Sequence, residues 1–322
     1  MVRIRIIKQA RLCHILLRYW LLLCLSLGVA IQASAASLLL VPSQSAQPYL
    51  QVVERLVEEL RESRFTFHIT PAAALNRPQL QQHQLVITLG IAALERALAL
   101  EGNSTILAAM VPRDSFTALT QAPSWQRALR QGRLSAIYLE QPYWRQLRLA
   151  RAIAPRAKRL GALLGPHSAA HQAELLTSLD EYGWQSTLTP MGEHDNPLSV
   201  IRRLVANSDL LLAVPDRADF NRNTARWLLM LSLREKVPLI GYSQRYVEAG
   251  AVASVFSSPL TIAAEAAAWA VRWRLDSPQQ LPPPDYPRLF DISLNPDIAA
   301  RLQLQLPSPS QLQQALQWDA TP

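Results

Sequence analysis

The chain has 322 residues, of which 49% are hydrophobic and 17% are charged. This length is sufficient for two domains with a sizeable core, and the composition excludes an intrinsically disordered chain. The formal net charge of +8 would suggest an anionic partner, but much of this charge lies in one N-terminal segment.

The first 35 residues have the pattern of a secretory signal peptide. Five basic residues and no acidic residue accompany an apolar stretch at 19–31, and Ala33-Ser34-Ala35 fits a cleavage site. The apolar stretch of about 13 residues is shorter than the ~20 that a membrane-spanning helix needs. A lipoprotein is disfavoured because the large Leu23 precedes Cys24. We therefore expect cleavage before Ala36 and export to the periplasm.

Removal of this segment changes both the charge and the thiol content. Five of the 32 Lys and Arg residues and none of the 24 Asp and Glu residues lie in it, so the remainder has 27 basic and 24 acidic residues and a net charge of +3. Cys13 and Cys24 also leave with it. The exported chain would therefore have no disulfide and no cysteine metal site, and its charge gives no reason to expect a nucleic-acid partner.

From residue 37 onward, apolar runs alternate with amphipathic segments, which is typical of parallel sheets flanked by helices. The first series predicts strands at 37–41, 65–69, 85–89, 106–111 and 134–139 and helices at 49–62 and 91–100. The second series predicts strands at 160–164, 185–189, 210–214, 237–240 and 251–256 and helices at 168–182, 197–206, 221–236, 244–248 and 259–275. Ser168 is expected to cap its helix. The sequence thus predicts an α/β fold with two lobes, each a mainly parallel sheet flanked by helices.

The segment 237–254, VPLIGYSQRYVEAGAVAS, predicts a buried strand, a polar loop, a short helix, a glycine turn and a second strand. Pro238, Gly241, Val247 and the run AGAVAS at 249–254 resemble substrate-binding proteins of ABC transporters, in the family that includes periplasmic receptors for aromatic amino acids. The resemblance extends from about residue 37 to beyond residue 294. It implies a two-lobed periplasmic-binding-protein type I fold that binds a ligand between its lobes and performs no chemistry.

The resemblance also implies three crossings between the lobes, near 140–142, near 256–258 and in the proline-rich segment 278–287. Lobe 1 would comprise 36–140 and 257–280, and lobe 2 would comprise 141–256 and 286–322. Trp269 and Trp273 share one face of the predicted helix 259–275, so we expect both to pack in the core.

Loops at the carboxyl ends of parallel strands converge on one crevice, where ligands bind. The candidate ligand-binding residues in these loops are Ser43, Gln44, Gly90, Ile91, Arg113, His167, Ser168, Asp216, Tyr242 and Ser243. Backbone N–H groups at helix starts can hold a carboxylate, Asp216 can pair with an amine, and an aromatic face can hold a cation.

Three of these loops depart from the family. The family usually has Gly-Thr or Gly-Ser after the third strand, a Thr-Asp-Pro type of turn after the fourth and Tyr-Gly after the last. This chain has Gly90-Ile91, Pro112-Arg113-Asp114 and Val255-Phe256 at these places. The ligand class is therefore left open, and one hypothesis is that Arg113 replaces the lost hydroxyl as a carboxylate clamp.

Other functional signals are weak. The sequence contains no G-x-S-x-G, P-loop, G-x-G-x-x-G or H-E-x-x-H motif. His167, His171 and Glu174 are the most metal-like group, but zinc needs further ligands, so we expect them to be surface residues. The basic run 145–159 is expected to be a solvated helix face. No metal or cofactor is predicted.

The sequence therefore favours an exported, monomeric solute-binding component of an ABC-type uptake system. It would bind a small polar or aromatic molecule by closure of its lobes and present it to a membrane permease. The alternative is a periplasmic sensor or protein-interaction module with a degenerate pocket, which the altered loops support.

Overall fold

The structure, a computed structural model, describes residues 36–63, 65–192, 194–216, 218–275 and 279–317, without the side chains of 218–223. The predicted signal peptide lies outside the described residues. In the described part, no helix is both long and apolar enough to cross a membrane.

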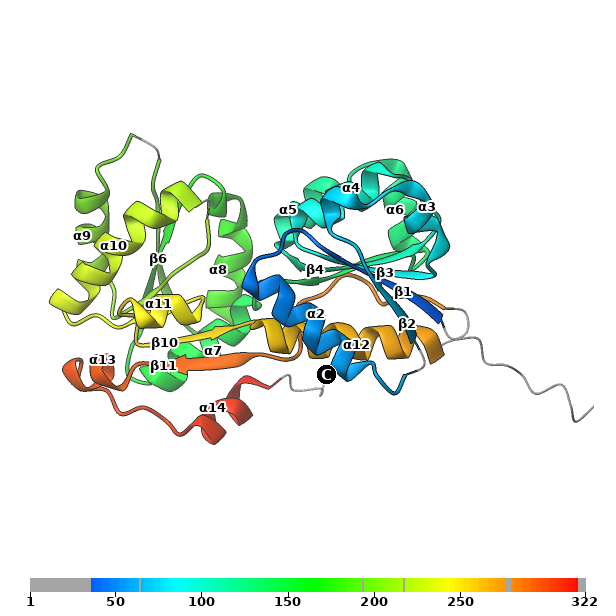
Figure 1. The fold of residues 1–322 in the computed structure, drawn as a ribbon. Helices are drawn as coiled ribbons and strands as arrows, with labels where there is room; N and C mark the ends of the chain where they lie inside the picture. The colour runs from blue at the N-terminus through cyan, green and yellow to red at the C-terminus, as the bar shows by residue number, and fades with distance from the viewer. Residues whose placement is uncertain (1–35, 64, 193, 217, 276–278, 318–322) are drawn as a thin grey trace, which may run out of the picture. The chain divides into compact units, whose positions relative to one another are not determined.

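Five strands form the first sheet, in the order β2-β1-β3-β4-β5 (Figure 1). Each of the pairs β1–β3, β3–β4 and β4–β5 is parallel. The strands are β1 (Ala36–Pro42), β2 (Phe65–Ile69), β3 (Leu85–Leu89), β4 (Thr105–Val111) and β5 (Leu134–Tyr138). The helical segments among them are α2 (Gln47–Glu59), η1 (Ala72–Ala74), α3 (Arg77–Gln82), α4 (Ile91–Ala99), α5 (Arg113–Leu119) and α6 (Pro123–Arg130).

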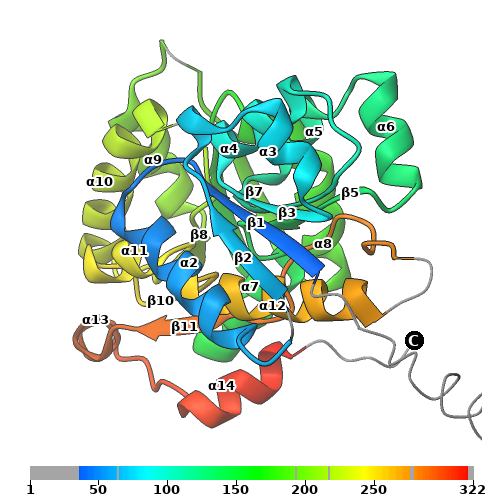
Figure 2. The same ribbon diagram turned by 45° about the vertical axis from the view of Figure 1, so that its right-hand side comes forward.

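Six strands form the second sheet, in the order β11-β10-β9-β8-β6-β7. Only β11 runs antiparallel to its neighbour β10 in the described pairs (Figure 2). The strands are β6 (Arg159–Leu164), β7 (Gln185–Pro190), β8 (Leu210–Leu212), β9 (Leu239–Gly241), β10 (Ala253–Phe256) and β11 (Asp291–Leu294). The helical segments are α7 (Tyr143–Ile153), η2 (Ser168–His171), α8 (Gln172–Glu181), α9 (Pro197–Ala206), α10 (Ala218–Arg234), α11 (Gln244–Glu248), α12 (Pro259–Leu275), α13 (Pro296–Arg301) and α14 (Pro309–Leu316). The prediction of two mainly parallel sheets flanked by helices is confirmed, whereas α3, α5, α6, β11, α13 and α14 were not predicted.

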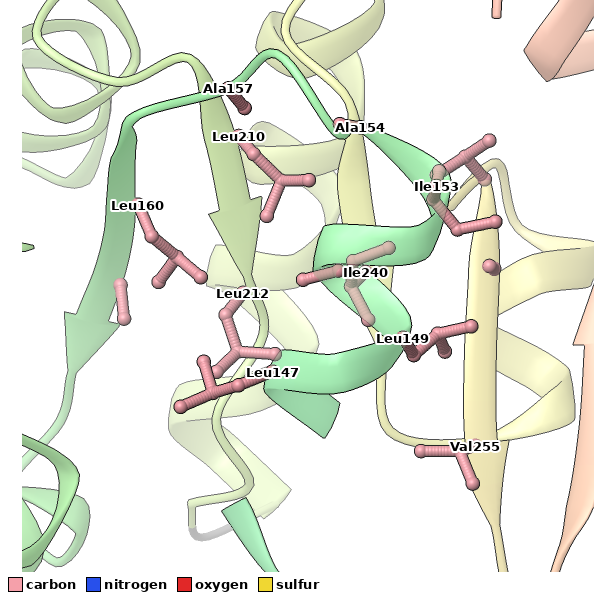
Figure 3. Close-up of a cluster of buried hydrophobic side chains, with 14 of the residues drawn as sticks. Leu147, Leu149, Ile153, Ala154, Ala157, Leu160, Leu210, Leu212, Ile240 and Val255 are labelled. Atoms are coloured by element: carbon pink, nitrogen blue, oxygen red, sulfur yellow. The ribbon is translucent and has the colours of Figure 1, made fainter. Parts of the chain in front are cut away.

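Both faces of the second sheet are covered, which explains its continuous apolar strands. Leu210 and Leu212 of β8 belong to one buried cluster together with Leu149 of α7 (Figure 3). The intervening Leu211 belongs to a second cluster, formed with α9 and α10. Because side chains alternate along a strand, these clusters lie on opposite faces of the sheet.

Helix α12 lies between β10 and β11 of the second sheet in sequence but packs against the first sheet, beside α2 and against β4 and β5 (Figure 1). Trp273 is buried in this contact, as predicted. Trp269 is only half-buried, and its indole N–H donates to Glu265 at 3.2 Å. The prediction that both tryptophans are core residues is therefore right for Trp273 only.

The chain passes between the sheets in three segments: 139–142 after β5, 257–258 after β10, and 286–290 before β11. One pair of side chains contacts all three, and we call Gln141 and Arg145 the junction pair. The Gln141 amide donates to Ser257 Oγ at 2.8 Å and to the Leu289 carbonyl at 3.4 Å. The junction pair therefore links the passages to one another.

Arg145 is buried, with only 1% of its surface exposed. Its guanidinium donates to Gln141 Oε1 and to the carbonyls of Pro287 and Leu316, the last two at 2.9 and 3.1 Å. It also lies 4.6 Å from the ring centroid of Phe290. Burial lowers the pKa of Arg145 to about 10, so the group remains cationic at neutral pH.

The predicted solvated face at 145–159 is therefore wrong for Arg145, whereas Arg156, Lys158 and Arg159 are exposed as predicted. In addition to Arg145, Arg151 lies 3.6 Å from the ring centroid of Trp184 and donates to the Ala157 carbonyl. Arginine combines a flat, weakly hydrated cation with several donors, so it can be buried against rings and carbonyls where periodicity alone suggests solvent.

The predicted helix cap at Ser168 is also wrong. The segment 168–182 divides into η2 and α8, and α8 begins after His171 without a side-chain cap. Ser168 Oγ instead donates to Asp216 at 2.6 Å and accepts from the Gly165 N–H at 2.8 Å. The Ser168 hydroxyl therefore binds the carboxylate of Asp216, which is distant in sequence, and does not cap a helix.

We predict that Arg145→Ala lowers the free energy of unfolding by about 3 kcal/mol or more, because it leaves buried acceptors without a donor. Urea unfolding followed by circular dichroism measures this loss. Arg156→Ala, at an exposed arginine beyond the end of α7, is the control and should change the stability by less than about 0.5 kcal/mol. Equal losses in the two variants would contradict a role for the junction pair in stability.

A second prediction concerns Asp209, whose carboxylate accepts from the Arg159 guanidinium at 2.7 Å and from the N–H groups of Lys158 and Arg159. These bonds, that of the guanidinium foremost, lower the pKa of Asp209 to about 2. A lowered pKa stabilises the fold above the unfolded-state value, and this stabilisation disappears as the pH falls through the folded value. Asp209→Asn should therefore cost about 1 kcal/mol at neutral pH. Urea unfolding at a series of pH values should show the difference shrinking between about pH 4 and pH 2; a constant difference would contradict it.

Candidate functional site

The candidates after β1 and β3 contact one another. Ser43 Oγ accepts from the Ala93 N–H at 2.9 Å and so holds the first turn of α4. Gly90 has a φ of 89°, and a Cβ there would lie 2.8 Å from Ser43 Oγ. Gln44 and Ile91 are exposed. Ser43 and Gly90 therefore have structural roles that the sequence does not reveal.

His167, Ser168 and Asp216 form a second group. The Asp216 carboxylate is fully buried and accepts from the N–H and the hydroxyl of Ser168 at 2.8 and 2.6 Å. His167 Nδ1 lies 3.9 Å from the same carboxylate. The acid that could pair with a ligand amine is therefore engaged in holding the turn after β6.

Tyr242 and Ser243 form the third group, at the end of β9. Ser243 caps α11 by accepting from the Tyr246 N–H at 3.3 Å. The rings of Tyr242 and Tyr246 lie 5.1 Å apart, and burial raises the pKa of both hydroxyls.

Arg113, the remaining candidate, begins α5 at the end of β4 and is the centre of a polar network. Its guanidinium donates to both carboxylate oxygens of Glu174 on α8, at 2.8 and 2.7 Å. It also donates to the Tyr286 hydroxyl at 2.6 Å and to His171 Nδ1 at 2.7 Å. The two bonds to Glu174 are the foremost cause of the raised pKa of Arg113. The contact therefore joins helices that flank different sheets.

Both ring nitrogens of His171 belong to this network. A guanidinium can only donate, so Nδ1 of His171 must accept from Arg113 and carries no proton. Nε2–H then donates to Asp114 Oδ2 at 2.5 Å.

Glu140 lies behind Arg113, in the first passage between the sheets. Its carboxylate accepts from the Arg113 backbone N–H at 3.1 Å. Burial is the foremost cause of the raised pKa of Glu140, and it also raises the pKa of the nearby Tyr143 and Tyr286 hydroxyls. This part of the network is half-buried and therefore partly shielded from water.

A small cavity of about 60 Å³ lies in this network. Its lining residues are Arg113, Asp114, Glu140, Gln141, Tyr143, Gln146, His171, Pro215 and Tyr286. Gln146 is only 3% exposed, and its Oε1 has no hydrogen-bond partner in the part of the chain that the structure describes.

Of the ten predicted site residues, only Arg113 lines this cavity. Several lining residues of the cavity were not among the predicted site residues. Four of them lie in or next to the passages between the sheets: Glu140, Tyr143, Gln146 and Tyr286. The site prediction considered only the carboxyl ends of strands. The predicted positions of the passages between the sheets are the sequence signal that could have located these four residues.

The metal-like group of the sequence is used otherwise. His171 and Glu174 both contact Arg113, and His167 lies beside Asp216 instead. Among the described residues, no group of three or more His, Cys, Asp or Glu side chains could hold a metal ion.

Neither a family model nor a curated protein matches the sequence, but solved structures match the fold. A ligand-free, open substrate-binding protein with adhesive properties from Clostridium difficile is 18% identical, with a TM-score of 0.67 over 85% of this chain and 97% of that one. An ABC domain in complex with L-Trp from Streptococcus pneumonia is 14% identical, with a TM-score of 0.54 over 86% and 98%. A periplasmic ribose ABC transporter protein from Conexibacter woesei is 11% identical, with a TM-score of 0.52 over 87% and 99%. The chain thus has the two-lobed α/β fold of periplasmic binding proteins, as the resemblance in its sequence implied.

Proposed function

We propose that the chain is an exported solute-binding protein of an ABC-type uptake system and that it binds a small polar or aromatic molecule without chemical change. The lobes would be 36–140 with 257–280, and 141–256 with 286–322. The cleavable N-terminal signal would deliver the chain to the periplasm, where it would act as a monomer and present its solute to a membrane permease.

One observation carries this proposal: polar side chains that flank both sheets converge on a cavity beside the three chain passages. Arg113 and Glu140 come from the first sheet's side, and His171 and Glu174 come from the second. In a two-lobed receptor, a solute at such a place would contact both lobes and stabilise their closed arrangement. The similarity in fold to the L-Trp-bound and ribose-transporter structures supports a solute role of this kind.

We call the ion pair of Arg113 and Glu174 the latch, because in the absence of solute it would hold α5 against α8. It is bidentate, which is the strongest geometry for this pair. A solute carboxylate could use Arg113 as its clamp only by displacing Glu174. The hypothesis of a carboxylate clamp therefore requires the solute carboxylate to compete with Glu174 for the Arg113 guanidinium.

A second function, as a sensor or adhesive interaction module, is favoured by that same contact, because the chain supplies its own carboxylate to Arg113. The compared substrate-binding protein from Clostridium difficile has adhesive properties, so the fold accommodates such a role. Gene deletion distinguishes the two functions: loss of uptake of one solute supports transport, whereas altered regulation or adhesion with normal uptake supports the alternative.

The proposal predicts that at least one small solute stabilises the chain from Ala36 onward against unfolding. The solutes to be tested are amino acids, peptides, nucleosides, sugars and amines. A solute at 100 times its dissociation constant adds about 2.7 kcal/mol to the unfolding free energy, which corresponds to roughly 5 °C. Thermal unfolding measures the shift. A flat result across the panel would contradict solute binding and favour the interaction module.

The second prediction concerns the latch. A double-mutant cycle with Arg113→Ala and Glu174→Ala should give a coupling energy of about 1 kcal/mol, since both side chains are partly exposed. The exposed pair of Arg55 and Glu58 on α2 is the matched control and should give less than about 0.5 kcal/mol. Urea unfolding measures both cycles, and a latch coupling no larger than the control would contradict the proposed contact.

A further inference from the structure

The cavity is surrounded by more negative than positive charge. Arg113 is its one guanidinium among the described lining residues, whereas Asp114 and Glu140 line it and Glu174 binds Arg113 at its edge. A further anion in this place would therefore meet carboxylates and a cation that is already paired.

The cavity also offers acceptors that need donors. Gln146 Nε2 donates to the Gln141 carbonyl at 3.0 Å, which leaves Oε1 as the buried atom without a partner among the described residues. A buried carbonyl without a donor costs free energy of about 1–3 kcal/mol. Glu140, next to it in the lining, carries a carboxylate whose Oε2 accepts from the Arg113 backbone N–H. Both groups are completed by a ligand that brings N–H donors and positive charge.

Two aromatic side chains complete the lining. Tyr143 and Tyr286 are half-buried. Tyr143 begins α7 directly after the first passage, and Tyr286 lies in the third passage with the Arg113 guanidinium 5.7 Å from its ring centroid. The face of a tyrosine ring attracts a cation, most strongly where water is excluded. A carboxylate, an unpaired carbonyl and aromatic rings together form a receptor for an alkylammonium group and a poor one for a carboxylate.

We propose that this cavity receives the protonated amino group of the solute, with Glu140 and Gln146 as the acceptors. This inference rests on the proposed function and deepens it, because it names the chemical class that the site selects. A volume of about 60 Å³ holds the ammonium head of a larger molecule, so the remainder of the solute lies outside this cavity. Asp216 is not the amine partner, since its carboxylate is engaged by Ser168.

The test uses the chain from Ala36 onward and three probes of similar size at equal ionic strength: propylammonium, propionate and propionamide. Ribose is added as a larger neutral probe. Binding is measured by isothermal titration calorimetry and by thermal unfolding. We expect propylammonium to bind, and propionate and propionamide to bind at least about tenfold more weakly.

Two variants locate the site. Glu140→Gln removes the charge but keeps an acceptor for the Arg113 N–H, and Gln146→Met removes the buried carbonyl at similar volume. Each should weaken propylammonium binding by about tenfold or more. Glu58→Gln, at an exposed position of α2, is the control and should leave binding unchanged. Thermal unfolding of each variant without a probe establishes that it is folded.

The outcomes separate this inference from the proposed function. Binding of propionate or ribose with no binding of propylammonium would overturn the amine site while leaving solute binding intact. Propylammonium binding that Glu140→Gln does not weaken would place the amine elsewhere and overturn the site. No binding by these probes or by the wider solute panel would overturn both.

Discussion

The buried guanidinium of Arg145 is the interaction on which this structure depends. Together with Gln141 it contacts all three passages of the chain between the two sheets and reaches the last helix through the Leu316 carbonyl. Burying a cation is costly unless its donors are satisfied, and here carbonyl oxygens and aromatic rings perform that role. The passages are therefore held together at their middle, while the sheets on either side are covered on both faces by their own helices.

This junction pair also determines where a solute site can form. Gln141 lines the cavity as well as bonding to Arg145, and Gln146 lies next to Arg145 on α7. The cavity is thus built on the most constrained part of the chain, whereas the Arg113–Glu174 contact at its edge is partly exposed. A buried junction pair beside a partly exposed Arg113–Glu174 ion pair is suited to a receptor whose lobes must open and close around a solute.

The sequence predicted the fold far better than the site. Alternating apolar runs are a local signal, so β3, β5 and α9 were found close to their true bounds, and the two-lobed architecture followed from the order of the elements. The site depends on partners that are distant in sequence. The local pattern predicts a helix cap at Ser168, because no nearby residue reveals its partner Asp216. It predicts a solvated Arg145, because no nearby residue reveals Phe290 and Leu316. The sequence groups Glu174 with His167 and His171 as a metal-like set, but the Arg113 guanidinium that binds Glu174 lies 61 residues earlier.

The most direct test of the account is a distance measurement across the junction. Both cysteines, Cys13 and Cys24, precede residue 36, so cysteines introduced at the exposed positions Arg127 on α6 and Arg202 on α9 can carry the only spin labels. Pulsed electron paramagnetic resonance would compare the chain alone with the chain saturated by the solute that stabilises it most. The account predicts a shift to a narrower distance distribution on binding, and stabilisation by the solute with an unchanged distribution would contradict it.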